Sequence, residues 1–313
     1  MELSVIVPCL NEAANLPELI QRVGEVFRLG NLDAPPKPGD AGEQDAPSAT
    51  PTGDAPLTLV TPPRPGHAEL ILVDDGSTDR SWELIEAARA RHPFVVGIRH
   101  PKNRGIAAAW RSGVAAARGH LVCILDADLQ YQPEDILRLR RELYFSNVDI
   151  VQGWRSAVGR QKGPRYYYSR GFNVLLNAAF GMNLQDNKSG FVLTSREIFA
   201  DLLDYRGDYH YWQSFIMVAA HAKGYTYKQI ETLFENRRAG TSFLAAHPVK
   251  PILRSFLDLG RAIGEYRLRP ARSSDLRLLT AEALASVQPG ATPDALDRDP
   301  EPEGRVQHQL ADR

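Results

Sequence analysis

The sequence predicts an α/β protein built on a doubly wound, mainly parallel sheet with helices on both faces. Five apolar stretches of strand length alternate with stretches whose apolar residues recur at helical intervals. This alternation is typical of parallel sheets, whose strands are joined by helical crossovers. Two acidic turns, VDDGSTD and LDADLQ, each follow a predicted strand directly. Ligands of such sheets bind outside the carboxyl ends of the strands, so these turns mark the expected site.

The elements follow in chain order. The continuous apolar run over 3–8 predicts a buried strand, and apolar residues of 16–27 then recur at helical spacing. Further strands are expected over 68–75, 94–100, 120–128, 148–154 and 225–234. Further helices are expected over 77–90, 103–119, 133–145, 211–224 and about 251–267. Ser77 or Thr78 is expected to cap the helix that follows it.

Composition divides the chain into regions. Residues 31–66 hold nine prolines, four glycines and no aromatic residue, so they are expected to form a disordered insertion. A main domain is expected over 1–245, with a C-terminal helical extension over 246–270. Residues 271–313 lack aromatic residues, and a flexible tail is expected there.

The charge balance and the cysteine content exclude several classes of protein. The net charge of −1 gives no support for a nucleic-acid partner. Cys9 and Cys123 both fall within predicted strands, as expected for buried thiols in a reducing compartment. The chain enters a strand at once, without a signal-peptide pattern, and no uncharged run is long enough to cross a bilayer. The expected location is cytoplasmic, either free or peripheral on the inner face of the membrane.

The acidic turn after the strand over 120–128 contains Asp126, Asp128 and Gln130. Side chains alternate along an extended chain, so these three are expected to present their oxygens on one side. Hard divalent cations such as Mg²⁺ prefer oxygen ligands and share them with substrate phosphates. The alternative is a solvated loop in which an aspartate caps the next helix.

The other acidic turn offers a second set of polar groups. Asp74 or Asp75 could accept hydrogen bonds from a base or a ribose, and Gly76 would allow close backbone approach. A simple capped turn is the alternative. Glu12, after the first strand, could form a further rim of the pocket. The sequence contains no Walker-type loop, no Gly-x-Gly-x-x-Gly and no His or Cys metal-binding pattern.

A basic stretch follows the fifth strand. Between Ile150 and Asp186 there is no acidic residue, while five basic residues are mixed with aromatic ones. The five are Arg155, Arg160, Lys162, Arg165 and Arg170. This composition suits a phosphate-bearing substrate at a membrane surface, although a solvated, positively charged helix face would look the same.

Taken together, the segments VIVPCLNE, ILVDDGSTDRS, NRGIAAAWRSGVAAARG and CILDADLQYQPED closely resemble the family 2 glycosyltransferases of the GT-A fold. The form DADLQ with QPED resembles the dolichol-phosphate mannosyltransferase branch and its bacterial polyprenyl-phosphate relatives. The resemblance covers roughly residues 1–245 apart from the insertion. It implies the GT-A fold, a nucleoside-diphosphate sugar as donor and a divalent metal, Mg²⁺ or Mn²⁺, as cofactor.

The resemblance also implies roles for individual residues. Those near the donor would be Pro8, Glu12, Asp74, Asp75, Asn103, Asp126, Ala127 and Ser242, with Asp126, Asp128 and Gln130 at the metal. Those at the reacting groups would be Arg155, Arg165, Ser169 and Arg237. Arg165 and Ser169 match positions that meet an acceptor phosphate, while Arg237 and Ser242 lie in RRAGTSF, which resembles a closing loop. Phe243 and Leu10 stand where the family usually has lysine and an aromatic residue, respectively.

Three functions remain open at this point. The first is an inverting transfer to a polyprenyl-phosphate or dolichyl-phosphate acceptor, whose anionic oxygen needs no general base. The second is a transfer to a glycan or other hydroxyl, for which Asp186 is the best candidate as base or to position the acceptor. The alternative for Asp186 is a turn residue that caps NKSG. The third is a non-catalytic protein that binds nucleotide sugars on the same fold.

Overall fold

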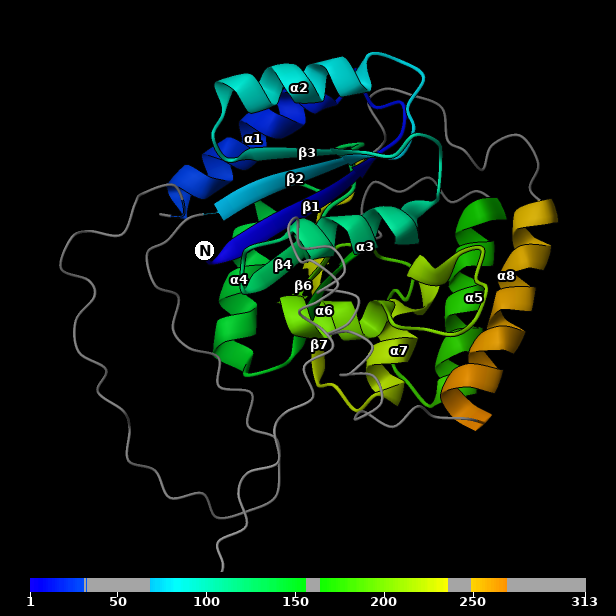
Figure 1. Ribbon diagram of the computed structural model, residues 1–313. Helices are drawn as coiled ribbons and strands as arrows, with labels where there is room; N and C mark the ends of the chain where they lie inside the picture. The colour runs from blue at the N-terminus through cyan, green and yellow to red at the C-terminus, as the bar shows by residue number, and fades with distance from the viewer. Residues whose placement is uncertain (31, 33–67, 156–163, 236–248, 269–313) are drawn as a thin grey trace, which may run out of the picture.

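The computed structural model describes residues 1–30, 32, 68–155, 164–235 and 249–268. The described residues form one seven-stranded sheet in the order β3-β2-β1-β4-β6-β5-β7 (Figure 1). The strands are β1 (Leu3–Cys9), β2 (Ala68–Asp74), β3 (Val95–Arg99), β4 (Leu121–Ile124), β5 (Ile150–Arg155), β6 (Val192–Ser195) and β7 (Tyr227–Thr232). Only β6 runs against its two neighbours, β4 and β5, so the sheet is mainly parallel as predicted.

Helices cover both faces of the sheet, and alternate strand residues pack against each layer. Val5 and Leu72 face a core under α1 (Leu16–Leu29), α2 (Ser81–Arg91) and α4 (Asp135–Ser146) (Figure 1). Ile6 and Ile71 face the other core, under α3 (Ile106–Ala116), α5 (Pro164–Phe180), α6 (Arg196–Leu203) and α7 (Ile216–Ala222). Strands buried on both sides explain the continuous apolar runs in the sequence.

The structure adds or corrects four elements. α5, β6 and α6 had no prediction. Ser195 ends β6 and caps α6, where its hydroxyl accepts a hydrogen bond from Ile198 N at 3.2 Å. The expected capping of α2 by Ser77 or Thr78 is wrong, because α2 begins at Ser81. The hydroxyl of Ser77 instead accepts a hydrogen bond from the backbone of Asn11 at 3.0 Å.

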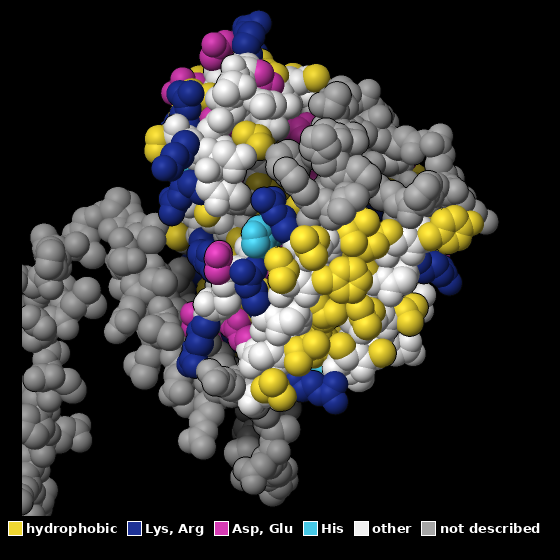
Figure 2. Space-filling model, turned by 90° about the vertical axis from the view of Figure 1, so that its right-hand side faces the viewer, with side chains coloured by type: hydrophobic (Ala, Val, Ile, Leu, Met, Phe, Trp, Pro, Cys, Tyr) yellow, Lys and Arg dark blue, Asp and Glu magenta, His cyan; other side chains and the backbone are white. Residues whose placement is uncertain are grey.

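The C-terminal helix predicted over about 251–267 is confirmed as α8 (Val249–Ala262), which continues into a π-helix, η2 (Ile263–Leu268). α8 lies beside α5 (Figure 1), on the side that Figure 2 views. Asp258 is fully buried and accepts hydrogen bonds from the backbone of His210 and Tyr211 at 3.1 and 2.8 Å. This helix therefore packs into the same core as the sheet.

The ends of the expected insertion meet in the structure. Leu32 is fully buried, and its carbonyl accepts a hydrogen bond from Ala68 N at 2.8 Å. The rest of the range 31–66 and the tail 271–313 lie outside the described residues. None of the helices that the structure describes combines the length and the apolar composition needed to cross a bilayer.

Candidate active site

The loops at one edge of the sheet gather most of the predicted site. β1, β2, β4 and β5 run parallel, so the segments that follow them emerge at the same edge. β6 runs in the opposite direction, so its beginning lies at that edge as well. The loop Asp186–Ser189, just before β6, is thereby placed beside the turn Asp126–Gln130 that follows β4.

The carboxylate of Asp75 holds the loop before α3. Oδ1 accepts hydrogen bonds from His100 Nδ1 at 2.6 Å and Arg104 N at 2.9 Å, while Oδ2 accepts from Gly105 N at 2.8 Å. His100 also contacts Ser112 Oγ at 2.9 Å through Nε2. Both oxygens of Asp75 are thus engaged within the protein.

Asp74 is fully buried at the end of β2. Its Oδ1 accepts a hydrogen bond from Ser77 N at 3.0 Å, and its Oδ2 lies 3.5 Å from Arg99 Nε without a hydrogen bond. Gly76 has a φ of +78°, and a Cβ there would lie 2.5 Å from the carbonyl carbon of Lys102. The close backbone approach expected at Gly76 is therefore an approach to the chain's own loop.

The loop after β1 is hydrogen-bonded to the loop after β2, and the two form one rim of the site. Asn11, which the sequence did not single out, accepts a hydrogen bond from Thr78 N at 2.8 Å and has a φ of +58°. Glu12 N donates to Ser81 Oγ at 2.9 Å, and Asn15 Nδ2 donates to the Glu12 carboxylate at 2.6 Å. Pro8 lies just upstream in β1, paired in register with Val73. Asn103, on the third loop, accepts a hydrogen bond from Gly105 N at 2.9 Å.

The turn Asp126–Gln130 is folded differently from the prediction. β4 ends at Ile124, and Leu129 has a φ of +56°, so the residues form a tight turn and the alternation expected of an extended strand does not apply. Asp128 is buried, with Oδ1 accepting a hydrogen bond from Gln130 N at 3.2 Å, while Asp126 is partly exposed. Ala127 between them packs into the core.

The donor atoms of this turn still fit a hard cation. Gln130 Nε2 donates to Glu235 O at 3.0 Å, which leaves the amide oxygen Oε1 as the acceptor of that side chain. Two carboxylates and one amide oxygen form an all-oxygen ligand set, the kind that Mg²⁺ and Mn²⁺ prefer. Across the residues that the structure describes, no group of three or more His, Cys, Asp or Glu side chains lies close enough to hold a metal. Any cation here would therefore need Gln130 and substrate oxygens beside the two aspartates.

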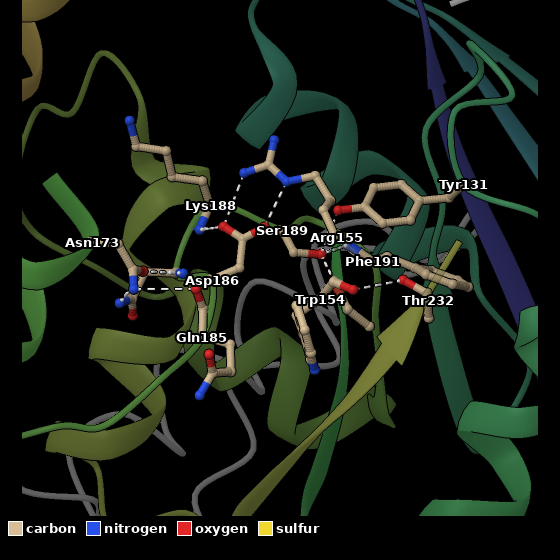
Figure 3. A network of polar contacts seen from close by, with 12 residues as sticks. Tyr131, Trp154, Arg155, Asn173, Gln185, Asp186, Lys188, Ser189, Phe191 and Thr232 are labelled. Carbon is tan, nitrogen blue, oxygen red and sulfur yellow. Dashed lines mark hydrogen bonds and ion pairs between the residues drawn. The ribbon is translucent and has the colours of Figure 1, made fainter. Parts of the chain in front are cut away.

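Arg155 and Asp186 form a bidentate ion pair at the centre of the site (Figure 3). Arg155 Nε lies 2.6 Å from Asp186 Oδ2, and Nη2 lies 2.9 Å from Oδ1. The side chains are only 17% and 11% exposed. Burial is the largest influence and disfavours the charged guanidinium, yet the surrounding groups, Asp186 foremost, together raise the pKa of Arg155 above its ordinary value.

A polar network fixes the loop that carries Asp186 (Figure 3). Ser189 accepts a hydrogen bond from the Tyr131 hydroxyl at 2.7 Å and donates to the carbonyl of Gly153. Gln229 Nε2 donates to Asp186 O at 3.0 Å. Burial raises the pKa of Tyr131, so its hydroxyl remains a neutral donor. These contacts tie the loop to the segment after β4 and to the strands β5 and β7.

Helix α5 holds the same loop from the other side. Asn173 Nδ2 donates to Leu184 O at 2.8 Å, and its Oδ1 accepts from Asn187 N at 2.7 Å. Lys188 places its ammonium 4.5 Å and 4.6 Å from the ring centres of Tyr168 and Phe172. The sequence prediction overlooked Lys188, although it lies two residues after Asp186. The run of basic residues before and within α5 gave the stronger signal in the sequence.

Several predicted site residues cannot be compared with the structure. Arg237 and Ser242, together with the loop they belong to, lie outside the described residues, as does Phe243. Arg165 falls in the first turn of α5, where the described part of the chain includes the backbone only. Ser169 is partly exposed on α5, between Tyr168 and Arg170. The roles of these residues stay predictions.

The fold and site define a GT-A type of protein, and comparison with solved structures supports that class. Glucosyl-3-phosphoglycerate synthase from Mycobacterium tuberculosis, in complex with Mn²⁺ and UDP-glucose, superimposes with a TM-score of 0.57 at 17% identity. The alignment covers 84% of this chain and 79% of that one. At this identity the likeness concerns the fold alone.

Residues 64–203 match the family model described as glycosyl transferase family 2. An undecaprenyl-phosphate 4-deoxy-4-formamido-L-arabinose transferase of Pseudomonas aeruginosa (strain LESB58) is 35% identical over 185 residues, which are 58% of this chain and 44% of the relative. A dolichol-phosphate mannosyltransferase of Pyrococcus furiosus is 28% identical over 204 residues, 63% of this chain and 47% of the relative. The chain thus spans less than half the length of these relatives.

Proposed function

We propose that this chain is an inverting glycosyltransferase that moves a sugar from a nucleoside-diphosphate donor to a polyprenyl-phosphate or dolichyl-phosphate acceptor. The reaction would take place at the inner face of a membrane, with a divalent cation bound at Asp126, Asp128 and Gln130. The names of the similar undecaprenyl-phosphate and dolichol-phosphate transferases support this class of acceptor.

The observation that carries the proposal is the pairing of Asp186 with Arg155. Both carboxylate oxygens of Asp186 contact the guanidinium, at 2.6 and 2.9 Å. A carboxylate held in this way is a poor general base, because taking up a proton would cost it the ion pair. A phosphate acceptor is already anionic and needs no base, so the pair suits a phosphate better than a hydroxyl.

In this proposal the reaction is a single displacement, in which the site residues have separate roles. An acceptor phosphate oxygen forms a bond to the anomeric carbon while the bond from that carbon to the diphosphate oxygen breaks, and its electron pair leaves with the nucleoside diphosphate. When bound, the cation would neutralise charge on the diphosphate. Asp186 engages Nε and Nη2 of Arg155. This leaves Nη1 to donate to a phosphate oxygen, so Asp186 positions Arg155.

The test is a transfer assay with the purified chain. Radiolabelled GDP-mannose and a panel of UDP-sugars are each offered with a short-chain polyprenyl phosphate and Mg²⁺ or Mn²⁺, and label is counted in the organic phase. We expect transfer from one donor, its loss with EDTA, and its loss in Asp128→Asn. The exposed Asp208→Asn is the matched control and should retain activity. Absence of transfer to the polyprenyl phosphate from every one of these donors would overturn the proposal.

A further inference from the structure

The solvent-facing side of α5 is apolar, which is unusual for a surface helix. Surface helices normally expose polar residues and bury an apolar stripe. On α5 the exposed positions recur every three to four residues, and only one of them is charged: Tyr167, Arg170, Gly171, Val174, Leu175 and Ala178. Tyr167 and Val174 are each 63% exposed. The helix therefore offers a continuous apolar stripe to its surroundings.

The neighbouring α8 repeats the pattern. Leu253 is 61% exposed, Phe256 47% and Leu257 52%, at positions that share one face of the helix. The buried Phe172 of α5 contacts Phe256 of α8, with ring centres 6.0 Å apart, so the two helices pack side by side. Figure 2 shows the resulting apolar patch on this side of the molecule, with basic side chains at its border.

The exposed charged residues of these helices have one sign. Arg170, Arg254 and Arg267 are exposed on the two helices and on the π-helix that continues α8. The sequence of α5 contains no acidic residue, and Asp258, the acidic residue of α8, is fully buried beneath the patch. An apolar face bordered by arginines matches the headgroup region of an anionic bilayer, in which aliphatic side chains insert and arginines meet lipid phosphates.

The position of the patch ties it to the active site. The less exposed positions Asn173, Tyr168 and Phe172 of α5 contact the loop of Asp186 and Lys188. A helix with its side chains is about 10–12 Å across. A surface bound to the patch is thus about one helix diameter from the loop that holds the Arg155–Asp186 pair.

We propose that the α5–α8 face binds the surface of an anionic phospholipid bilayer, with both helices lying in its plane. Binding there brings a lipid-borne phosphate to the side of the site lined by α5, a consequence that rests on the proposed function. Vesicle binding itself follows from the two helix faces and needs neither donor nor acceptor.

Vesicle flotation tests the binding directly. The purified chain is mixed with vesicles of phosphatidylcholine, either alone or with about 30% phosphatidylglycerol, which gives a strongly anionic surface. We expect flotation with the anionic vesicles. Val174→Ser/Leu253→Ser should lower the partition coefficient at least tenfold. Each aliphatic side chain that is half-buried in the bilayer should contribute a factor of roughly five to that coefficient. Leu29→Ser/Phe145→Ser, whose side chains are 70% and 71% exposed elsewhere on the molecule, is the matched control and should change it less than twofold.

A second variant guards against misfolding as the cause. Arg170→Gln/Arg254→Gln keeps the apolar face and should remove the preference for anionic vesicles, by about fivefold for each arginine. Failure of the wild type to float with anionic vesicles would overturn the proposal, as would equal losses in the two serine pairs. Light scattering could instead show a dimer that does not float with the vesicles and that Val174→Ser/Leu253→Ser dissociates. That result would assign the face to a second copy of the chain.

The same samples separate this proposal from the proposed function. Transfer to a short, water-soluble polyprenyl phosphate should be equal in the wild type and in Val174→Ser/Leu253→Ser. Flotation without transfer to any acceptor would support the bilayer-binding face and contradict the proposed function. Transfer without flotation would support the proposed function and contradict the bilayer-binding face.

Discussion

Replacement of Asp186 by asparagine should cost stability as well as activity. The asparagine side chain would be nearly isosteric but neutral, so the Arg155 guanidinium would keep its place without a counter-charge. With side chains only 17% and 11% exposed, the pair is largely screened from water. Removing one partner from a buried pair costs roughly 3–5 kcal/mol. The residual exposure and the retained amide oxygen place Asp186→Asn at the lower end, about 3 kcal/mol.

A double-mutant cycle measures the pair itself. Arg155→Gln alone leaves a buried carboxylate and should also lose about 3 kcal/mol, whereas Arg155→Gln/Asp186→Asn removes both charges and should lose about 2 kcal/mol in total. The coupling free energy would then be about 4 kcal/mol. At about 2–4 °C per kcal/mol for a chain of this size, Asp186→Asn should lower Tm by roughly 6–12 °C.

Urea unfolding followed by circular dichroism gives the free energies, and a thermal melt gives Tm. Glu83→Gln is the control, because it removes a carboxylate from an ion pair with Arg80 whose side chains are 79% and 67% exposed. That change should stay within about 0.5 kcal/mol. If Asp186→Asn proves as stable as Glu83→Gln, Arg155 and Asp186 are not a buried, coupled pair. Asp186 would then again be a candidate general base.

Three further experiments test the fold. Gly76→Ala should destabilise by about 2 kcal/mol in urea, because of its φ of +78° and the backbone of Lys102; an unchanged midpoint would contradict this. Burial raises the pKa of the thiols of Cys9 and Cys123, so native protein should not react with Ellman's reagent at about pH 8, and both thiols should react in denaturant; rapid native reaction would refute their burial. Replacement of 33–67 by a short Gly-Ser linker should shift Tm by less than about 2 °C, since the flanking residues are already hydrogen-bonded; a larger loss would show that this segment stabilises the fold.

The parallel half of the sheet could be predicted because its signals are local. β1, β2 and β4 are buried on both faces, so apolar runs such as 3–8 stand out, and α1 shows regular apolar spacing. β6 is different: it has four residues, and its antiparallel pairing with β4 and β5 joins segments distant in sequence. A four-residue strand of sequence VLTS, followed directly by a helix, is too short to show a periodicity of its own.

The site was predicted by position better than by geometry. The acidic turns do lie at one edge, as the parallel topology requires. The spacing of Asp126, Asp128 and Gln130 was interpreted as alternation in a strand, but the left-handed backbone at Leu129 depends on tertiary contacts that spacing does not record. Likewise, the contact between Arg155 and Asp186 crosses 31 positions and exists only because β6 reverses direction.

That reversal has a consequence for how the acceptor would be oriented. Because β6 begins at the active edge, the loop before it lies against α5, and α5 separates the loop from the apolar patch. An acceptor lipid entering from the patch would meet Lys188 before Arg155, since Lys188 lies over the rings of α5 whereas Arg155 extends from the end of β5 (Figure 3). Lys188→Gln should therefore raise KM for the polyprenyl phosphate several-fold while leaving KM for the donor unchanged. Equal changes in both constants would place Lys188 at the donor side and remove α5 as the route of entry.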